Sequence, residues 1–159
     1  KESLHLEEFD LSELTEMVAE EAQGLVESKA VTLTAEIEPG ILVKADQTLM
    51  MRIWLNLLTN AVKYGRQQGQ IWLTLKSDGK NAVGTVRDDG IGISAAELPK
   101  IWKRFYRVNT ARSSGDDSGT GLGLAMVKWM VESHGGTVSA VSTLGAGSTF
   151  SFTIPLRPS

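Results

Sequence analysis

The chain of 159 residues contains no cysteine, which excludes disulfide bonds and thiolate metal ligands and fits a cytoplasmic location. It also has no excess of basic residues, since 16 Lys and Arg stand against 19 Asp and Glu, so no nucleic acid partner is expected. Apolar runs fall short of the roughly 20 residues that span a bilayer, and we expect no direct membrane contact. The 42% hydrophobic and 22% charged content fits one folded domain over residues 1–159.

The first residues are charged and lack an initiator Met. No internal repeat or low-complexity segment marks a second domain. We therefore interpret the chain as one domain of a longer protein, with residues 1–8 as the remnant of a linker from a preceding domain.

Hydrophobic periodicity and turn residues predict an α+β chain. Helices are expected at residues 11–28, 46–64 and 122–134, with short ones at 94–98 and 100–106. Strands are expected at residues 31–37, 41–45, 70–76, 82–87, 137–142 and 148–155. Because hairpin-like strand pairs alternate with helices, we expect a two-layer sandwich in which one mixed sheet carries its helices on one face.

Two aspartates mark the starts of the longer helices. Asp10 is predicted to cap the first helix, with Glu13 completing a capping box, and Asp46 is predicted to cap the second. Gly65 is expected to end that second helix. In the first helix the apolar positions predict one buried face, made of Leu14, Met17, Val18 and Leu25.

Glycines occupy alternate positions in the run Gly119-Thr120-Gly121-Leu122-Gly123-Leu124, which follows a polar stretch and precedes an apolar helical segment. Alternate glycines allow backbone amides to approach a phosphate near a helix N-terminus. Three familiar phosphate loops do not fit. The third glycine falls one residue early for a dinucleotide fingerprint, no Gly-Lys-Ser/Thr P-loop is present, and no His-Arg-Asp loop of protein kinases is present.

The helix expected at residues 46–64 carries a polar stripe beside its apolar face. Asn56 and Asn60 are four residues apart and Lys63 follows three later, so all three share one side of the helix. An amide oxygen there suits a cation, and a lysine suits a phosphate. The alternative interpretation is that the asparagines only cap or bridge packing.

The sequence Asp88-Asp89-Gly90-Ile91-Gly92-Ile93 follows a predicted strand. A carboxylate at Asp88 can accept a hydrogen bond from an adenine amino group, and the glycines would allow the base to approach the backbone. An ordinary Asp-Gly turn is the alternative. Residues 101–107 mix aromatic and basic side chains, which suits either a lid that clamps a phosphate or an amphipathic helix with a solvated basic face.

Four motifs in this order resemble those of sensor histidine kinases. Residues 56–64 resemble the N box, residues 88–93 the first glycine box, residues 101–107 the F box, and residues 119–124 the second glycine box. Residues 134–150 also look like the closing hairpin of the family. The chain departs from the family pattern at Trp102, Lys103 and Gly65.

The resemblance implies a Bergerat-type sandwich whose mixed, mainly antiparallel sheet is covered on one face by about three helices, with a mobile lid over ATP. It implies Mg²⁺ as a second cofactor, held by Asn60, and ADP as a product. Asn56, Lys63 and Arg107 would act on the phosphates, with Arg107 at the γ-phosphate, and Asp88 would bind adenine. The other implied nucleotide contacts are Tyr64, Gly90, Gly92, Ile93, Phe105, Gly119, Thr120, Gly121, Leu122, Gly123 and Leu124, and weaker candidates are Arg104 and Arg112.

The resemblance also implies a histidine kinase that transfers the γ-phosphate to a histidine on a separate dimerisation domain, followed by a response regulator. Asn56 stands where gyrase-like relatives have a glutamate, and an amide is no general base, which favours transfer over hydrolysis. His5 and His134 are not credible acceptors, His134 standing at a helix C-terminus where a cation suits the dipole. The isolated chain is thus expected to bind ATP without autophosphorylating, as the cytoplasmic domain of a membrane-bound sensor. A serine kinase of the anti-sigma type and a non-catalytic nucleotide sensor remain as alternatives.

Overall fold

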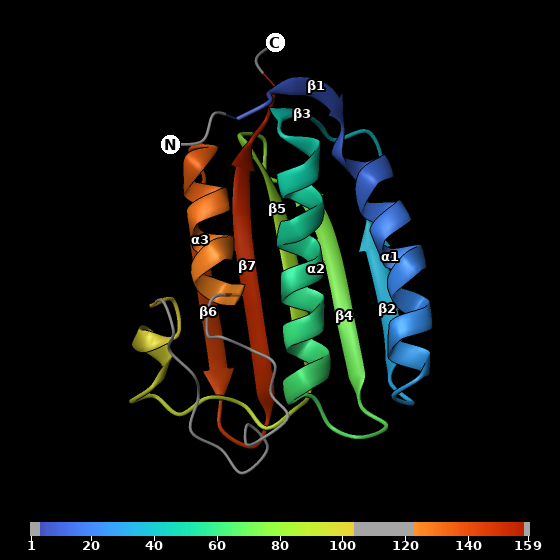
Figure 1. Ribbon diagram of the computed structural model, residues 1–159, viewed down its shortest axis with the longest axis vertical. Coiled ribbons are helices and arrows are strands. Elements are labelled where there is room, and N and C mark those ends of the chain that lie inside the picture. The colour runs from blue at the N-terminus through green and yellow to red at the C-terminus, as the bar shows by residue number, and fades with distance from the viewer. Residues whose placement is uncertain (1–3, 104–122, 158–159) are drawn as a thin grey trace.

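The computed structural model describes residues 4–103 and 123–157. Its elements follow the predicted order, with one strand added at the start (Figure 1). The helical elements are α1 (Leu11–Glu27), α2 (Gln47–Tyr64), the 3-10 helix η1 (Leu98–Lys100) and α3 (Gly123–Ser133). The strands are β1 (Glu7–Asp10), β2 (Thr32–Ile37), β3 (Leu42–Ala45), β4 (Gln70–Ser77), β5 (Asn81–Asp88), β6 (Val138–Thr143) and β7 (Gly147–Pro155).

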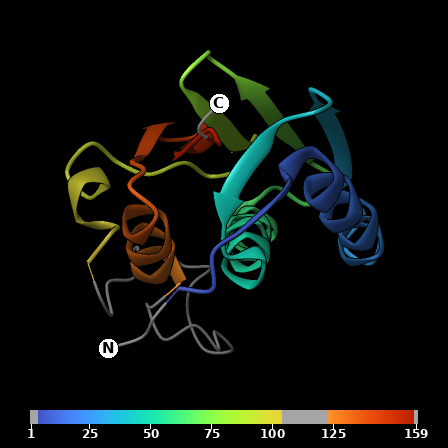
Figure 2. The ribbon, with the colours of Figure 1, turned by 90° about the horizontal axis from the view of Figure 1, so that it is seen from above.

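Five strands form the main sheet in the order β2-β4-β5-β7-β6. β2 pairs with β4 in parallel, and the other three pairings are antiparallel. Helices α1, α2 and α3 lie side by side on one face of this sheet, as the view from above shows (Figure 2). The predicted α+β sandwich, with a mixed and mainly antiparallel sheet under three helices, is confirmed. None of the helices in the described ranges combines the length and hydropathy of a membrane span.

The prediction of one sheet built from hairpin-like pairs was wrong at its start. β3 pairs with β1 in a separate two-stranded antiparallel sheet, and β2 pairs with β4 instead of its neighbour β3. The sequence of β1 contains Glu7, Glu8 and Asp10, which are rare in strands, and its partner lies more than 30 residues away. No local pattern therefore indicated this strand.

The predicted helix starts are confirmed by their capping hydrogen bonds. The Asp10 carboxylate accepts from the backbone N–H of Glu13 at 3.1 Å, and the Asp46 carboxylate accepts from the N–H of Leu49 at 3.1 Å. Such caps satisfy backbone donors that have no partner within the helix. At the other end of α2, Gly65 is the C-cap residue, as predicted.

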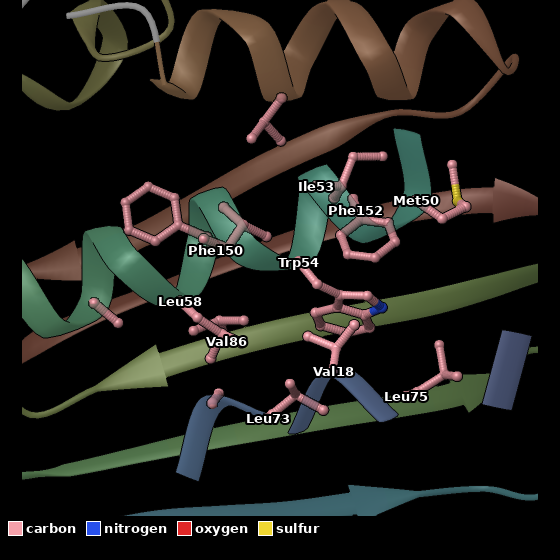
Figure 3. Packing of buried hydrophobic residues seen from close by; sticks show 14 of the residues in the cluster. Val18, Met50, Ile53, Trp54, Leu58, Leu73, Leu75, Val86, Phe150 and Phe152 are labelled. Atoms are coloured by element: carbon pink, nitrogen blue, oxygen red, sulfur yellow. The ribbon is translucent and has the colours of Figure 1, made fainter. Parts of the chain in front are cut away.

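The core lies between the helices and the main sheet, with Trp54 at its centre (Figure 3). Trp54 is fully buried and meets Phe152 edge to face, with 4.9 Å between ring centroids. Its indole N–H donates to the hydroxyl of Thr15 at 2.9 Å, and that hydroxyl donates to the carbonyl of Leu11 at 2.8 Å. A Cβ at Gly84 would overlap both rings, so glycine at this position of β5 leaves room for the tryptophan.

The predicted buried face of α1 was half wrong. Leu14 and Val18 are buried, but Met17 and Leu25 are 43% and 37% exposed. Met17 directly precedes Val18 and lies about 100° from it around the helix, outside the buried side. Leu25 lies on the same side of the helix as Leu14 and Val18, but it stands in the last turn of α1. Helix α1 covers the edge of the sheet.

The segment after β5 contains less helix than predicted. Instead of a helix at residues 94–98, the carbonyl of Ser94 accepts from the N–H groups of Glu97 and Leu98, and the 3-10 helix follows. Ile101 is buried, and Trp102 meets Phe150 edge to face with 6.0 Å between ring centroids. The helix predicted at residues 100–106 runs beyond Lys103, outside the described residues.

Candidate functional site

Three segments that are distant in sequence meet at one end of the sandwich: the C-terminus of α2, the loop after β5, and the turn between β6 and β7 (Figure 1). The backbone N–H of Ile91 donates to the carbonyl of Tyr64 at 3.2 Å. On its other side, the carbonyl of Ile91 accepts from the N–H of Gly145 at 2.7 Å. The structure thus brings together two of the predicted motifs, residues 56–64 and residues 88–93.

Asp88 is the last residue of β5, and its side chain is buried at 4% exposure. Its carboxylate accepts from the N–H of Gly90 at 2.8 Å. Burial raises the pKa of Asp88 to about 6, because loss of water disfavours the charged form, and the charge of Asp89 adds to the rise. Backbone hydrogen bonds from Gly90 and Ser148 act in the opposite direction. A buried carboxylate of this kind is costly to the fold, and such groups concentrate at functional sites.

Gly90 and Gly92 have structural reasons to be glycine. A Cβ at Gly90 would overlap the carbonyl oxygen of Tyr64, and a Cβ at Gly92 would overlap that of Thr143. Gly92 also has φ +75°, a conformation that favours glycine. The loop is therefore packed directly against the end of α2 and the end of β6. That these glycines also shape a base pocket stays a prediction.

Two serines that the sequence analysis missed support this loop. The buried residue Ile93 donates its N–H to the hydroxyl of Ser142 at 2.7 Å. Ser142 in turn donates to the carbonyl of Gly147 at 2.9 Å and lies 2.8 Å from the hydroxyl of Ser148. Ser148 is buried and pairs with Asp88 in the register of β5 and β7. The sequence shows only that both serines lie on the strands of one predicted hairpin. That they lie opposite each other follows from the register of β6 and β7, which the sequence does not give.

The residues predicted on α2 lie where the helical spacing placed them. Asn56, Asn60 and Tyr64 are half-buried and Lys63 is exposed, so the polar stripe borders the buried face. The Lys63 ammonium lies 5.4 Å from the centroid of the Tyr64 ring. The side-chain amide of Asn60 makes no hydrogen bond with any part of the chain that the structure describes, so its oxygen is available to a ligand.

The metal-ligating side chains of this site suit a magnesium ion that is shared with a phosphate better than a metal ion that is held by protein ligands alone. Within residues 4–103 and 123–157, no group of three or more His, Cys, Asp or Glu side chains could hold a metal ion. Magnesium in phosphoryl-transfer sites is held by one or two protein ligands together with the phosphates of the substrate. A single amide oxygen, as at Asn60, suits that arrangement.

Part of the predicted site lies outside the described residues. This part includes Phe105, Arg107 and the run Gly119, Thr120, Gly121 and Leu122, together with the weaker candidates Arg104 and Arg112. Of the glycine run, the structure describes Gly123 and Leu124, which are the first residues of α3. Leu124 packs against the core, and a Cβ at Gly123 would have no atom of the described residues within 4 Å.

His134 has a structural role at the end of α3. Its Nδ1 donates to the carbonyl of Met130 at 2.7 Å, and its Nε2 accepts from the N–H of Asp46 at 3.1 Å. Both ring nitrogens are therefore engaged in hydrogen bonds with the backbone. The ring links the end of α3 to the start of α2.

The fold and the site together define an α+β sandwich domain. In it, the end of a helix that carries two asparagines is hydrogen-bonded to the loop that follows the buried Asp88. Residues 45–158 match the family model described as histidine kinase-, DNA gyrase B- and HSP90-like ATPases, and the chain belongs to this family. The predicted resemblance to the catalytic, ATP-binding domain of sensor histidine kinases is confirmed by the relatives.

The chain is 38% identical over 149 residues to the sensor histidine kinase TmoS of Ectopseudomonas mendocina, covering 93% of this chain and 15% of that protein. A solved structure of the mycobacterial sensor histidine kinase MprB superposes with a TM-score of 0.83 at 28% identity, covering 96% of this chain and all of that one. Full-length ShkA in complex with AMPPNP has a TM-score of 0.84 at 28% identity, covering 99% of this chain and 32% of that one. The chain spans between 15% and 32% of the length of the curated relatives TmoS, CikA, YclK and RppB.

Proposed function

We propose that this chain binds Mg-ATP and presents the γ-phosphate to a histidine on a separate dimerisation domain of the same parent protein. The observation that carries the proposal is the buried carboxylate of Asp88, which ends β5 directly before a loop that is hydrogen-bonded to the end of the asparagine-bearing helix. A buried acceptor of this kind selects a ligand that brings its own N–H donor. Adenine has such a donor in its amino group, and the solved relative ShkA is titled as a complex with AMPPNP.

In this proposal each group of the site has a separate task. Asp88 accepts the adenine amino group, and Asn60 offers its amide oxygen to Mg²⁺, which neutralises phosphate charge when bound. Asn56 and Lys63 orient the phosphates, and Tyr64 supports the ribose or phosphate end. Beyond the described residues, Arg107 contacts the γ-phosphate, and Phe105 and the glycine run form the lid. Little covalent chemistry is required of the protein, because phosphoryl transfer depends on positioning and electrostatics.

The choice of acceptor follows from the same residues. Asn56 cannot remove a proton from water at neutral pH, so hydrolysis is slow and the γ-phosphate is kept for another acceptor. Both ring nitrogens of His134 are engaged in hydrogen bonds. We therefore place the acceptor histidine on a dimerisation domain of the parent, which would be a dimeric membrane-bound sensor with this domain in the cytoplasm. A response regulator would take the phosphoryl group next, and we expect no nucleic acid partner and no direct membrane contact.

Two measurements test the proposal. Titration calorimetry with AMPPNP and Mg²⁺ is expected to show binding that Asp88→Asn weakens by at least about tenfold, because an amide N–H would face the adenine amino group. Unchanged affinity in this variant contradicts the assignment of Asp88.

Incubation of the chain with radiolabelled ATP and the parent's own dimerisation domain is expected to label a histidine, whereas the chain alone stays unlabelled. Label on a serine would support the serine kinase alternative. Binding without any transfer would support a nucleotide sensor.

A further inference from the structure

Arg66 follows the residue that ends α2, and its side chain reaches two loops. Its Nε donates to the carbonyl oxygen of Asp89 at 2.5 Å, and its Nη2 donates to the carbonyl oxygen of Gly145 at 2.8 Å. A guanidinium holds its N–H groups in a rigid planar fork, so this one side chain sets the separation of the two carbonyls. Arg66 is exposed and therefore contributes little to the core.

The two acceptors belong to the loop after β5 and to the turn between β6 and β7. These segments are also joined through Ile91, which donates to Tyr64 and accepts from Gly145. With Arg66 the contacts form a closed ring: the end of α2 binds the loop, the loop binds the turn, and the turn binds the end of α2 again. Asp88 lies immediately before Asp89, so the ring restrains the backbone that carries the buried carboxylate.

We propose that Arg66 is a positioning residue for nucleotide binding: it holds residues 88–91 against the β6–β7 turn so that Asp88 meets the base in a preformed geometry. The proposal rests on the proposed function of the site. Its physical basis is that a loop already fixed in the bound conformation does not lose conformational freedom when the ligand arrives. Without the guanidinium, the Ile91–Gly145 hydrogen bond still ties the turn to the loop. The loop is then less ordered before the nucleotide binds, so part of the free-energy cost of ordering it reduces the binding affinity.

Three variants test this role. Arg66→Met keeps the length of the side chain and removes both donors, and Arg66→Lys keeps the charge but not the fork. Arg52→Met is the matched control, because Arg52 is an exposed arginine that lies on α2, about 20 Å from the C-terminal end of that helix at 1.5 Å per residue. AMPPNP affinity is measured by calorimetry with Mg²⁺, well below the unfolding temperature of each variant. The exchange rate of the Gly145 amide is measured by NMR in the absence of nucleotide.

We expect Arg66→Met to weaken AMPPNP binding by roughly 3- to 10-fold, the size of one or two exposed charge-assisted hydrogen bonds, and to speed exchange of the Gly145 amide. Arg66→Lys should recover part of the affinity, and Arg52→Met should leave both measurements unchanged. If Arg66→Met lowers only the unfolding temperature while affinity and exchange stay as in the wild type, the residue is merely structural and the proposal is overturned. Should Arg66→Met be too unstable to measure, Arg66→Gln replaces it with the same criteria.

The wild-type titration separates this proposal from the one on which it rests. If the wild-type chain does not bind AMPPNP, the proposed function fails. If the wild type binds and Arg66→Met binds equally well, the function stands and the role of Arg66 fails.

Discussion

The two ends of α2 are held in different ways. At the N-terminal end, side chains make the contacts. The Asp46 carboxylate accepts from the N–H groups of Leu49 and His5, and the backbone N–H of Asp46 donates to the ring of His134. At the C-terminal end, the last residue of the helix contacts the loop through its backbone, since the carbonyl of Tyr64 accepts from the N–H of Ile91, and the Arg66 side chain adds its contacts just beyond the helix.

This difference determines which substitutions each end tolerates. Side-chain contacts can be removed one at a time, and each is worth about 1 kcal/mol. Backbone contacts at close range leave no room for a side chain, as at Gly90, where a Cβ would overlap the Tyr64 carbonyl. The functional loop lies at the end where Gly90 packs its backbone directly against the Tyr64 carbonyl, and such a position does not tolerate even a small added side chain.

The largest effect is expected from Gly90→Ala. The added Cβ would displace the loop from α2, lowering the free energy of unfolding by about 2–3 kcal/mol and AMPPNP affinity by at least about tenfold. Urea unfolding and calorimetry measure the two quantities. Gly24→Ala in α1 is the control, because a Cβ there would have no neighbour within 4 Å among residues 4–103 and 123–157, and alanine favours a helix by about 0.5–1 kcal/mol. Similar behaviour of the two variants would contradict the contrast between the ends of α2.

The next effect is a change of about tenfold in AMPPNP affinity with pH, which is expected from the titration of Asp88. Its pKa, raised by burial to about 6, means that the carboxylate is about 90% protonated at pH 5 and can no longer accept freely. Because the folded pKa lies above the unfolded value, this group favours the folded state most below about pH 4, and that contribution is lost as pH rises through about 6.

Nucleotide affinity has the opposite pH dependence, since adenine requires the ionised form. Titration of the ¹³C carboxyl shift of Asp88 by NMR checks the pKa directly, without interference from the phosphates of ATP. Between pH 7.5 and 5, AMPPNP affinity should fall about tenfold further in the wild type than in Asp88→Asn, which serves as the control. A midpoint near 4 in the NMR titration would contradict the effect of burial on the pKa of Asp88.

Contacts between residues close in sequence were predictable, and contacts between distant residues were not. The caps at Asp10 and Asp46 involve residues only three positions away, so their pattern is visible in the sequence. The strand Glu7–Asp10 and the parallel partner of β2 depend on distant residues, and no local pattern contains them. The exposed Met17 shows that an apolar residue at the border of a helical stripe is not assigned by period alone.

The site divides in the same way. Asp88 and its glycines were found because one short segment contains them. Ser142 and Arg66 were missed because they reach the loop only after the strands are in register and α2 has ended beside it. Phe105, Arg107 and residues 119–122 stay predictions from the resemblance alone.

The smallest effect is expected at the N-terminal end of α2. His134→Ala removes the acceptor of the Asp46 N–H, and we expect it to lower the free energy of unfolding by about 1 kcal/mol, because water reaches the half-buried pair and replaces part of the hydrogen bond. His134→Gln is the matched variant, since its amide oxygen offers an acceptor at a similar distance from the backbone. Urea unfolding at pH 7.5 should place the glutamine variant between alanine and wild type, with AMPPNP affinity unchanged in both. A loss of affinity in His134→Ala would show that the two ends of α2 are coupled, and the contrast drawn between them would then fail.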